Sequence, residues 1–312
     1  MNRIHFLCVP FTGLGLFKGM RGKTWLKNRI EVFKKFVIPA LMNQTKQEFI
    51  VWMCFRPEEK TDPIVQELQK SLESLRGMRF VFTWGGIPFY DDKYPDKIAK
   101  ERLMESLELS LPSLKEYVSD NTDYVLMTIQ PSDDCYLSHA IEEIQNVEYK
   151  EKQAVGYTQG YVCNYGTMAI AEWNPTTLPP FSTILFPPEV FLDPQKHFEH
   201  TGAYESHEYI TKNLEFKPLQ GRGFLVGTHG ENISTGFTHA FRGSLLSEQE
   251  KEKVLIKTGL FLAKPIILKK DIKRKIMKRI INCLPSFMQR YIIRCLSPGV
   301  TSSIKSYKWF RV

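Results

Sequence analysis

The chain has 312 residues, of which 43% are hydrophobic, and its six cysteines are too scattered for a zinc-knuckle spacing. This length favours one large α/β domain with an appendage, or two small domains, and is long enough to fold without disulfides or a structural metal. No stretch has the roughly 18 uncharged apolar residues of a membrane span, and the N-terminus carries no apolar signal segment. We therefore expect a cytoplasmic protein.

The net charge of +8 is distributed unevenly along the chain. Residues 264–312 carry 13 Lys/Arg and one acid, whereas residues 1–263 carry 29 Lys/Arg and 33 Asp/Glu. A nucleic-acid-binding domain more often carries its positive charge on the folded body. Because the body is mildly acidic, we expect no nucleic acid partner.

In the first 150 residues, short apolar runs alternate with amphipathic patterns. Pro39 is expected to kink or end the first helix early, and Pro112 to divide the third. Alternation of this kind predicts an α/β fold with a Rossmann-like, mostly parallel central sheet flanked by helices. The predicted strands are 4–9, 49–55, 79–82 and 124–129, and the predicted helices are 26–41, one from Pro63, 96–117 and one starting near Tyr136.

The remainder of the chain has a different character. Residues 151–235 are dense in Gly, Pro and aromatics, and short strands at 167–172 and 183–186 indicate a small mixed sheet with loops. Beyond residue 264 the chain is both basic and apolar. Ile272, Ile276 and Ile280 fall on one arc of a helix and bases on the other, which is the pattern of an interfacial helix on an anionic membrane. The alternative is a helix that docks its apolar arc on the protein's own core.

The strongest local motif is Ser132-Asp133-Asp134, directly after the fourth predicted strand. Ligands of open α/β sheets bind outside the carboxyl ends of the strands. Adjacent carboxylates there can hold a divalent cation, which neutralises charge on a departing diphosphate. Ser-Asp-Asp is also common in turns and helix N-caps, so the motif alone leaves both interpretations open.

Several blocks of the sequence resemble the rhamnosyltransferase family of the GT-A glycosyltransferases. The resemblance covers about residues 1–240 and consists of matching sequence patterns rather than extended identity. It supports the GT-A fold more strongly than it supports rhamnose as the transferred sugar. Its first blocks are Arg29, Phe33, Pro39-Ala40-Leu41, Gln44-Thr45 and 49–52; Ser132-Asp133-Asp134 matches the acidic motif, and 180–183, 206–207 and 229–235 match later blocks.

The resemblance implies transfer of a sugar from a nucleoside-diphosphate donor to a glycan or lipid-linked acceptor, with Mn or Mg as cofactor. Asp133 would contact the ribose and Asp134 the metal, and His229 would complete the metal site, since imidazole suits Mn better than Mg. The alternative for His229 is a surface histidine in a Gly-flanked loop. The residues expected to bind the donor are Pro10, Phe11, Arg29, Arg102 and Asp133, and those expected at the metal are Asp133, Asp134 and His229.

An inverting transferase also needs a base within hydrogen-bond reach of the acceptor hydroxyl. Glu205 and His207 stand at the start of a predicted helix, where related enzymes place that base. Acids in a first helical turn are also ordinary partners of the helix dipole. On this resemblance, residues 1–263 form the glycosyltransferase domain, with residues 1–150 as its nucleotide-binding half and residues 151–263 as its acceptor half. The charge and apolar pattern of residues 264–312 separately predicts a basic tail at the inner face of the membrane.

Two departures from the family pattern leave other functions open. The family usually has a further Asp where this chain has Pro131, and commonly an Asp near the end of the second strand, where this chain has Arg56. A catalytically inactive, membrane-associated sugar-binding protein is one alternative. A nucleotidyltransferase is the other, because the segment 11–15, with Lys18 and Arg21 after it, partly matches the Gly-rich, basic loop of that class.

Overall fold

The computed structural model describes residues 2–11, 22–85, 96–148, 150–179, 181–202, 207–229, 237 and 245–268. The predicted tail beyond residue 268 lies outside this part of the chain, as do Arg21 and Glu205. The side chains of Arg102 and His207 are likewise not described.

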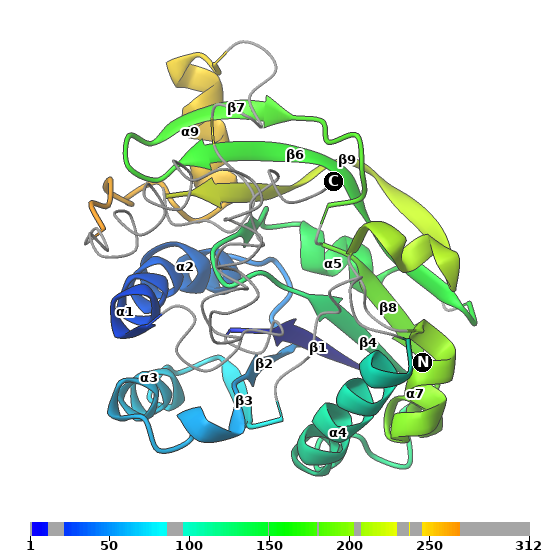
Figure 1. Cartoon of the computed structure of the whole chain (residues 1–312). Coiled ribbons are helices and arrows are strands. Elements are labelled where there is room, and N and C mark those ends of the chain that lie inside the picture. The colour runs from blue at the N-terminus through cyan, green and yellow to red at the C-terminus, as the bar shows by residue number, and fades with distance from the viewer. Residues whose placement is uncertain are drawn as a thin grey trace, which may run out of the picture.

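The described residues build one nine-stranded mixed sheet, in the order β3-β2-β1-β4-β8-β6-β9-β5, with β7 pairing to β6 (Figure 1). The first four strands in this order are parallel, and β6 also runs parallel to β9. The expected α/β fold, with a mixed, mostly parallel sheet flanked by helices, is confirmed. The strands are β1 Arg3–Val9, β2 Ile50–Cys54, β3 Arg79–Thr83, β4 Tyr124–Ile129, β5 Cys135–Tyr136, β6 Gln153–Asn164, β7 Ala169–Trp173, β8 Thr183–Phe186 and β9 Glu215–Thr228.

Helices cover both faces of the sheet and enclose two hydrophobic cores. One core packs α1, α2, α3, α5 and α9 against the sheet, and the other packs α4, α6 and α7. Figure 1 shows α1 and α2 separated from α4 and α7 by the strands. The helices are α1 Gly22–Val32, α2 Ile38–Met42, α3 Pro63–Glu73, α4 Asp96–Lys115, α5 Ala140–Gln145, α6 Pro188–Phe191, α7 Pro194–Thr201 and α9 Glu248–Lys257, with a π-helical segment Phe33–Val37 and 3₁₀ segments Pro57–Glu59 and His207–Lys212.

The four strands predicted in the first half are present, but two prolines act differently from expectation. The helix continues past Pro39 to Met42, because the turn before it widens into the π-helical segment, with the Ile38 N–H bonded to Phe33 O. A π-bulge displaces the backbone carbonyls that a proline ring would otherwise meet. Pro112 lies inside α4 near its end and does not divide the helix.

Two expectations for the second half are wrong. Tyr136 does not start a helix: Cys135 and Tyr136 form β5, which pairs antiparallel with Leu225 and Phe224 of β9, and α5 begins only at Ala140. The strands after residue 151 do not form a small sheet of their own, since β6, β8 and β9 extend the central sheet. Both errors concern pairings between distant segments, which local sequence patterns do not reveal.

Two further observations concern the cysteines and the membrane. Cys8, Cys54, Cys135 and Cys163 are buried and free. A search of the described helices finds none with the length and apolarity needed to cross a bilayer.

Candidate functional site

The candidate site lies where the strand order reverses. β1 stands between β2 and β4: the chain steps outward from β1 to β2 and β3, and then crosses back to place β4 on the other side of β1. A crevice opens at such a switch point, outside the carboxyl ends of the strands. Gln130 follows β4, and its backbone N–H donates to Cys8 O of β1 at 2.8 Å. The residues after β4 therefore start directly beside the end of β1.

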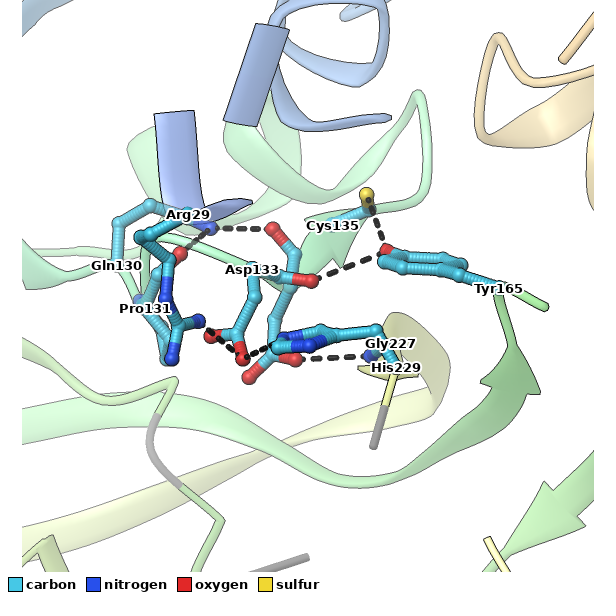
Figure 2. A network of polar contacts seen from close by, with 9 residues as sticks. Arg29, Gln130, Pro131, Asp133, Cys135, Tyr165, Gly227 and His229 are labelled. Atoms are coloured by element: carbon cyan, nitrogen blue, oxygen red, sulfur yellow. Dashed lines mark hydrogen bonds and ion pairs between the residues drawn. The ribbon is translucent and has the colours of Figure 1, made fainter. Parts of the chain in front are cut away.

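The turn that carries the two aspartates is held at both ends. Gln130 is fully buried, and its Nε2 donates to Pro131 O at 3.0 Å and to Asp134 O at 2.7 Å. Beyond the turn, β5 is paired with β9. Figure 2 shows the side chain of Gln130 reaching the backbone oxygens at the two ends of the turn. The carboxylates are thus fixed by the backbone around them rather than carried on a free loop.

Asp133 is an ion-pair partner for two groups that come from distant parts of the chain. Arg29 of α1 and His229, which follows β9, both contact its Oδ2, the His229 Nε2 at 3.1 Å (Figure 2). Burial alone would raise the pKa of Asp133, but the Arg29 guanidinium and the hydrogen bond from His229 hold it well below the usual carboxyl value. Asp133 is therefore ionised, and its charge is offset by Arg29.

Asp134 has the opposite electrostatic environment. Its Oδ1 accepts a hydrogen bond from the Gly227 N–H at 2.8 Å, and the residue is only 5% exposed. Burial and the negative charge of Asp133 raise its pKa well above the usual carboxyl value, against a smaller opposing effect of that hydrogen bond. Arg29 offsets only one of the two carboxylates, so Asp134 tends to hold its proton, and a bound cation would take the place of that proton.

Tyr165, in the turn between β6 and β7, supports the aspartates from behind. Its hydroxyl donates to Asp133 O at 3.1 Å, and its ring stacks on Phe36 with the centroids 3.7 Å apart. A Cβ on Gly227 would overlap both the Tyr165 ring and Asp133 O. Only a glycine fits at residue 227 while its N–H still reaches Asp134.

The structure brings together four of the predicted site residues: Arg29, Asp133, Asp134 and His229. Pro10 and Phe11 follow β1 at the same edge of the sheet, but the Phe11 ring is buried against Phe33 and Phe55, at 5.4 and 5.2 Å between centroids. A donor contact at Phe11 would therefore come from its backbone. The predicted base candidate Glu205 and the side chains of His207 and Arg102 lie outside what the structure describes.

The chemistry of this cluster matches the ligand preferences of a divalent cation only in part. In the described ranges, no three His, Cys, Asp or Glu side chains are arranged to hold a metal ion together. Mg²⁺ and similar hard cations are often held by one or two carboxylates, with substrate phosphates and water completing the shell. Asp134, whose ionised form Arg29 does not fully offset, fits that mode, in which a cation displaces its proton and a diphosphate supplies the remaining oxygens.

Three residues that matter to the geometry are not identified from the sequence as part of the site: Gln130, Tyr165 and Gly227. Tyr165 stands out in the sequence only as one of several aromatics suited to stack on a sugar or to pack, and the structure places it in the core. Gly227 lies inside an apolar strand, where an isolated glycine signals a close backbone approach. That signal could have identified it, whereas nothing local distinguishes Gln130.

No protein-family model matches the sequence, and comparison with curated proteins also finds no match. Among solved structures, S. aureus TarS is similar over 98% of this chain and 55% of its own length, with 10% identity and a TM-score of 0.29. Mouse xyloside xylosyltransferase 1, in its apo form, is similar over 70% of this chain and 86% of its own, with 13% identity and a TM-score of 0.30.

These similarities are distant. The chain spans only about half the length of TarS. None of the matches supports the rhamnosyltransferase family in particular. The interpretation of the site therefore rests on its own geometry.

Proposed function

We propose that this protein is a metal-assisted glycosyltransferase that uses a nucleoside-diphosphate sugar as donor. The observation that carries the proposal is the pair of buried carboxylates at the switch point: Arg29 offsets Asp133, whereas burial and Asp133 disfavour the ionised form of Asp134. A site that only stabilised the fold would gain nothing from a second carboxyl group in this environment, because ionising it there is costly.

In this proposal each residue of the cluster has a distinct role toward the donor. Asp134 provides the carboxylate ligand for Mn or Mg, and His229 lies close enough to the same cluster to contribute its imidazole. A cation held there would neutralise the charge that develops on the departing diphosphate. Asp133 keeps Arg29 in place and would accept a hydrogen bond from the donor ribose. Arg29 adds positive charge beside the diphosphate.

The acceptor side of the proposal rests on the sequence motifs. A glycan or lipid-linked acceptor would lose its hydroxyl proton to Glu205 or His207, which open the segment before Lys212. Rhamnose as the transferred sugar also rests on the motifs alone. The proposed basic tail would hold the enzyme at the inner face of the membrane, where a lipid-linked acceptor is found.

Donor hydrolysis tests this function directly. The protein is incubated with uridine, guanosine and thymidine diphosphate sugars, with Mn²⁺ or with chelator, and release of nucleoside diphosphate is measured. We expect release from one of these donors, in Mn²⁺ only, because transferases commonly leak donor to water. The Asp120→Asn variant is the control, since Asp120 is exposed and precedes β4, whereas the cluster follows the opposite end of that strand.

Two outcomes would count against the function. Donor binding without any hydrolysis or transfer would favour a sugar-binding protein. Release of inorganic diphosphate from a nucleoside triphosphate, with no activity on diphosphate sugars, would favour a nucleotidyltransferase.

A further inference from the structure

The segment that follows α9 is fixed against the N-terminal helices rather than extending away from them. Asn43 Nδ2 donates to Ile256 O at 3.1 Å and to Lys257 O at 3.2 Å, and Lys35 Nζ donates to Pro265 O at 3.1 Å. Figure 1 shows this segment, in orange, running beside α2. The start of the predicted tail, residues 264–266, is therefore part of the folded body.

A close backbone fit explains why this segment keeps its position. Gly259 has a φ of 69°, and a Cβ there would lie 2.8 Å from Pro39 O and 2.6 Å from the Asn43 Cβ. Leu260 and Ile266 are buried, and the Ile266 N–H donates to Tyr165 O at 2.8 Å. Between these two anchors, every residue except Ala263, which packs on the core, is exposed.

Exposed apolar side chains concentrate on this one surface. Seven large apolar side chains are exposed among the residues that the structure describes, and five of them belong to this segment or to the adjoining ends of α2 and α9. Leu262 is 86% exposed and Ile267 is 93% exposed, so these side chains protrude instead of lining a groove. Large exposed apolar side chains gathered on adjoining segments mark an interaction surface. We call this the apolar edge: Met42, Ile256, Phe261, Leu262 and Ile267.

The charges around the apolar edge are mainly basic. Exposed lysines lie on α9 and on the segment after it: Lys253, Lys257 and Lys264. Lys34 is exposed on the neighbouring π-helical segment. Beyond the first turn of α9, the helix has one acidic residue, Glu252. The other acids of α9 lie at its far end, where Glu250 caps the helix with Ser247.

We propose that the apolar edge is a docking surface for an anionic lipid bilayer. Protruding apolar side chains ringed by lysines suit the boundary between lipid headgroups and acyl chains. A second copy of the chain fits less well, because an isologous contact would bring two sets of lysines together. The chain also leaves the described body at Leu268, beside this edge, and continues into residues 269–312 with 12 Lys/Arg and one acid. The proposal concerns the folded body and does not depend on the sugar-transfer function.

Vesicle co-sedimentation of the full chain tests the proposal. Wild-type protein and the double variant Leu262→Asp/Ile267→Asp are compared on vesicles of phosphatidylcholine alone and of equal parts phosphatidylcholine and phosphatidylglycerol. The control is Leu109→Asp, because Leu109 is 53% exposed on α4, away from the edge. We expect wild type and control to bind the anionic vesicles, and the double variant to bind at least about tenfold more weakly, since each buried Leu or Ile contributes strongly to partitioning.

A second double variant tests how much the lysines beside the apolar edge contribute to binding. Lys257→Glu/Lys264→Glu keeps the apolar side chains and is expected to reduce binding to the anionic vesicles by about tenfold, with the remaining binding weakened less by salt than that of the wild type. Equal binding by wild type and both double variants would overturn the proposal, as would a wild type that ignores anionic vesicles. A concentration-dependent dimer that Leu262→Asp/Ile267→Asp abolishes, without vesicle binding, would assign the edge to self-association instead.

Discussion

Replacing Asp134 with asparagine is expected to abolish Mn²⁺-dependent activity while leaving the protein folded and slightly more stable. Asparagine keeps the size of the side chain and an Oδ1 that accepts the Gly227 N–H, so the turn retains its hydrogen bond. It removes the negative charge that burial and Asp133 both disfavour. Loss of a charged metal ligand typically costs several kcal/mol in the transition state, on the order of a thousandfold in rate.

The stability gain follows from the direction of the pKa shift. The folded-state pKa of Asp134 is raised above its unfolded value, so ionisation costs folding free energy as the pH rises through that range. At neutral pH the wild-type protein bears this cost and the Asp134→Asn variant does not. Denaturant unfolding at neutral pH measures the difference, and Mn²⁺ titration calorimetry measures the lost binding.

Asp133→Asn provides the matched comparison one residue away. This variant leaves the Arg29 guanidinium, which is 3% exposed, without its carboxylate partner. Breaking a buried pair on one side typically costs about 3–5 kcal/mol, so this variant should be strongly destabilised where Asp134→Asn is not. If the two variants behave alike in stability, or if Asp134→Asn keeps its Mn²⁺ dependence, the assigned roles are wrong.

Gly227→Ala is expected to be among the most damaging single substitutions in the protein. The added methyl group would overlap the Tyr165 ring and the backbone oxygen of Asp133. The ring cannot easily move, because it is stacked on Phe36 and bonded to Asp133 O. Overpacking of a tight core commonly costs about 1–3 kcal/mol, and we expect the upper end of that range because one overlapping atom is backbone.

The affinity for Mn²⁺ distinguishes a specific effect of Gly227→Ala on the site from a general loss of stability. Moving Gly227 weakens its hydrogen bond to Asp134, so Mn²⁺ affinity should fall even at temperatures where the variant is fully folded. Gly166→Ala is the control: it lies next to Tyr165, but its Cβ would meet the nearest atom, Asn164 Oδ1, only at 3.2 Å. Equal unfolding free energies and Mn²⁺ affinities for the two variants would contradict the role given to Gly227.

The sequence predicts the parts of the structure that depend on nearby residues. The apolar runs before Pro10 and Gln130 predict β1 and β4 because each run is a buried parallel strand bounded by a turn. Asp62 and Pro63 predict the start of α3, where the Asp62 side chain accepts the Ile64 N–H. Once these strands are known to be parallel, Asp133 and Asp134 must lie at the carboxyl edge of the sheet.

The rest of the site depends on contacts across long separations in sequence. Arg29, Asp133 and His229 meet only because α1, the turn after β4 and the end of β9 converge on one edge. The family resemblance identifies these residues as candidates, but it does not indicate that Arg29 forms its ion pair with Asp133 rather than with Asp134. That asymmetry comes from the depth of burial and the direction of each side chain, which one sequence does not contain.

The most direct test of the central claim is the location of bound Mn²⁺. Crystals grown with Mn²⁺ and a nucleoside diphosphate would be measured at the manganese absorption edge, and the anomalous difference density would locate the ion. The account predicts one strong peak at coordination distance, roughly 2.0–2.6 Å, from an Asp134 carboxylate oxygen, with the diphosphate on its other side. A nucleotide bound at the switch point with no metal peak at Asp134, or a peak elsewhere in the protein, would contradict it.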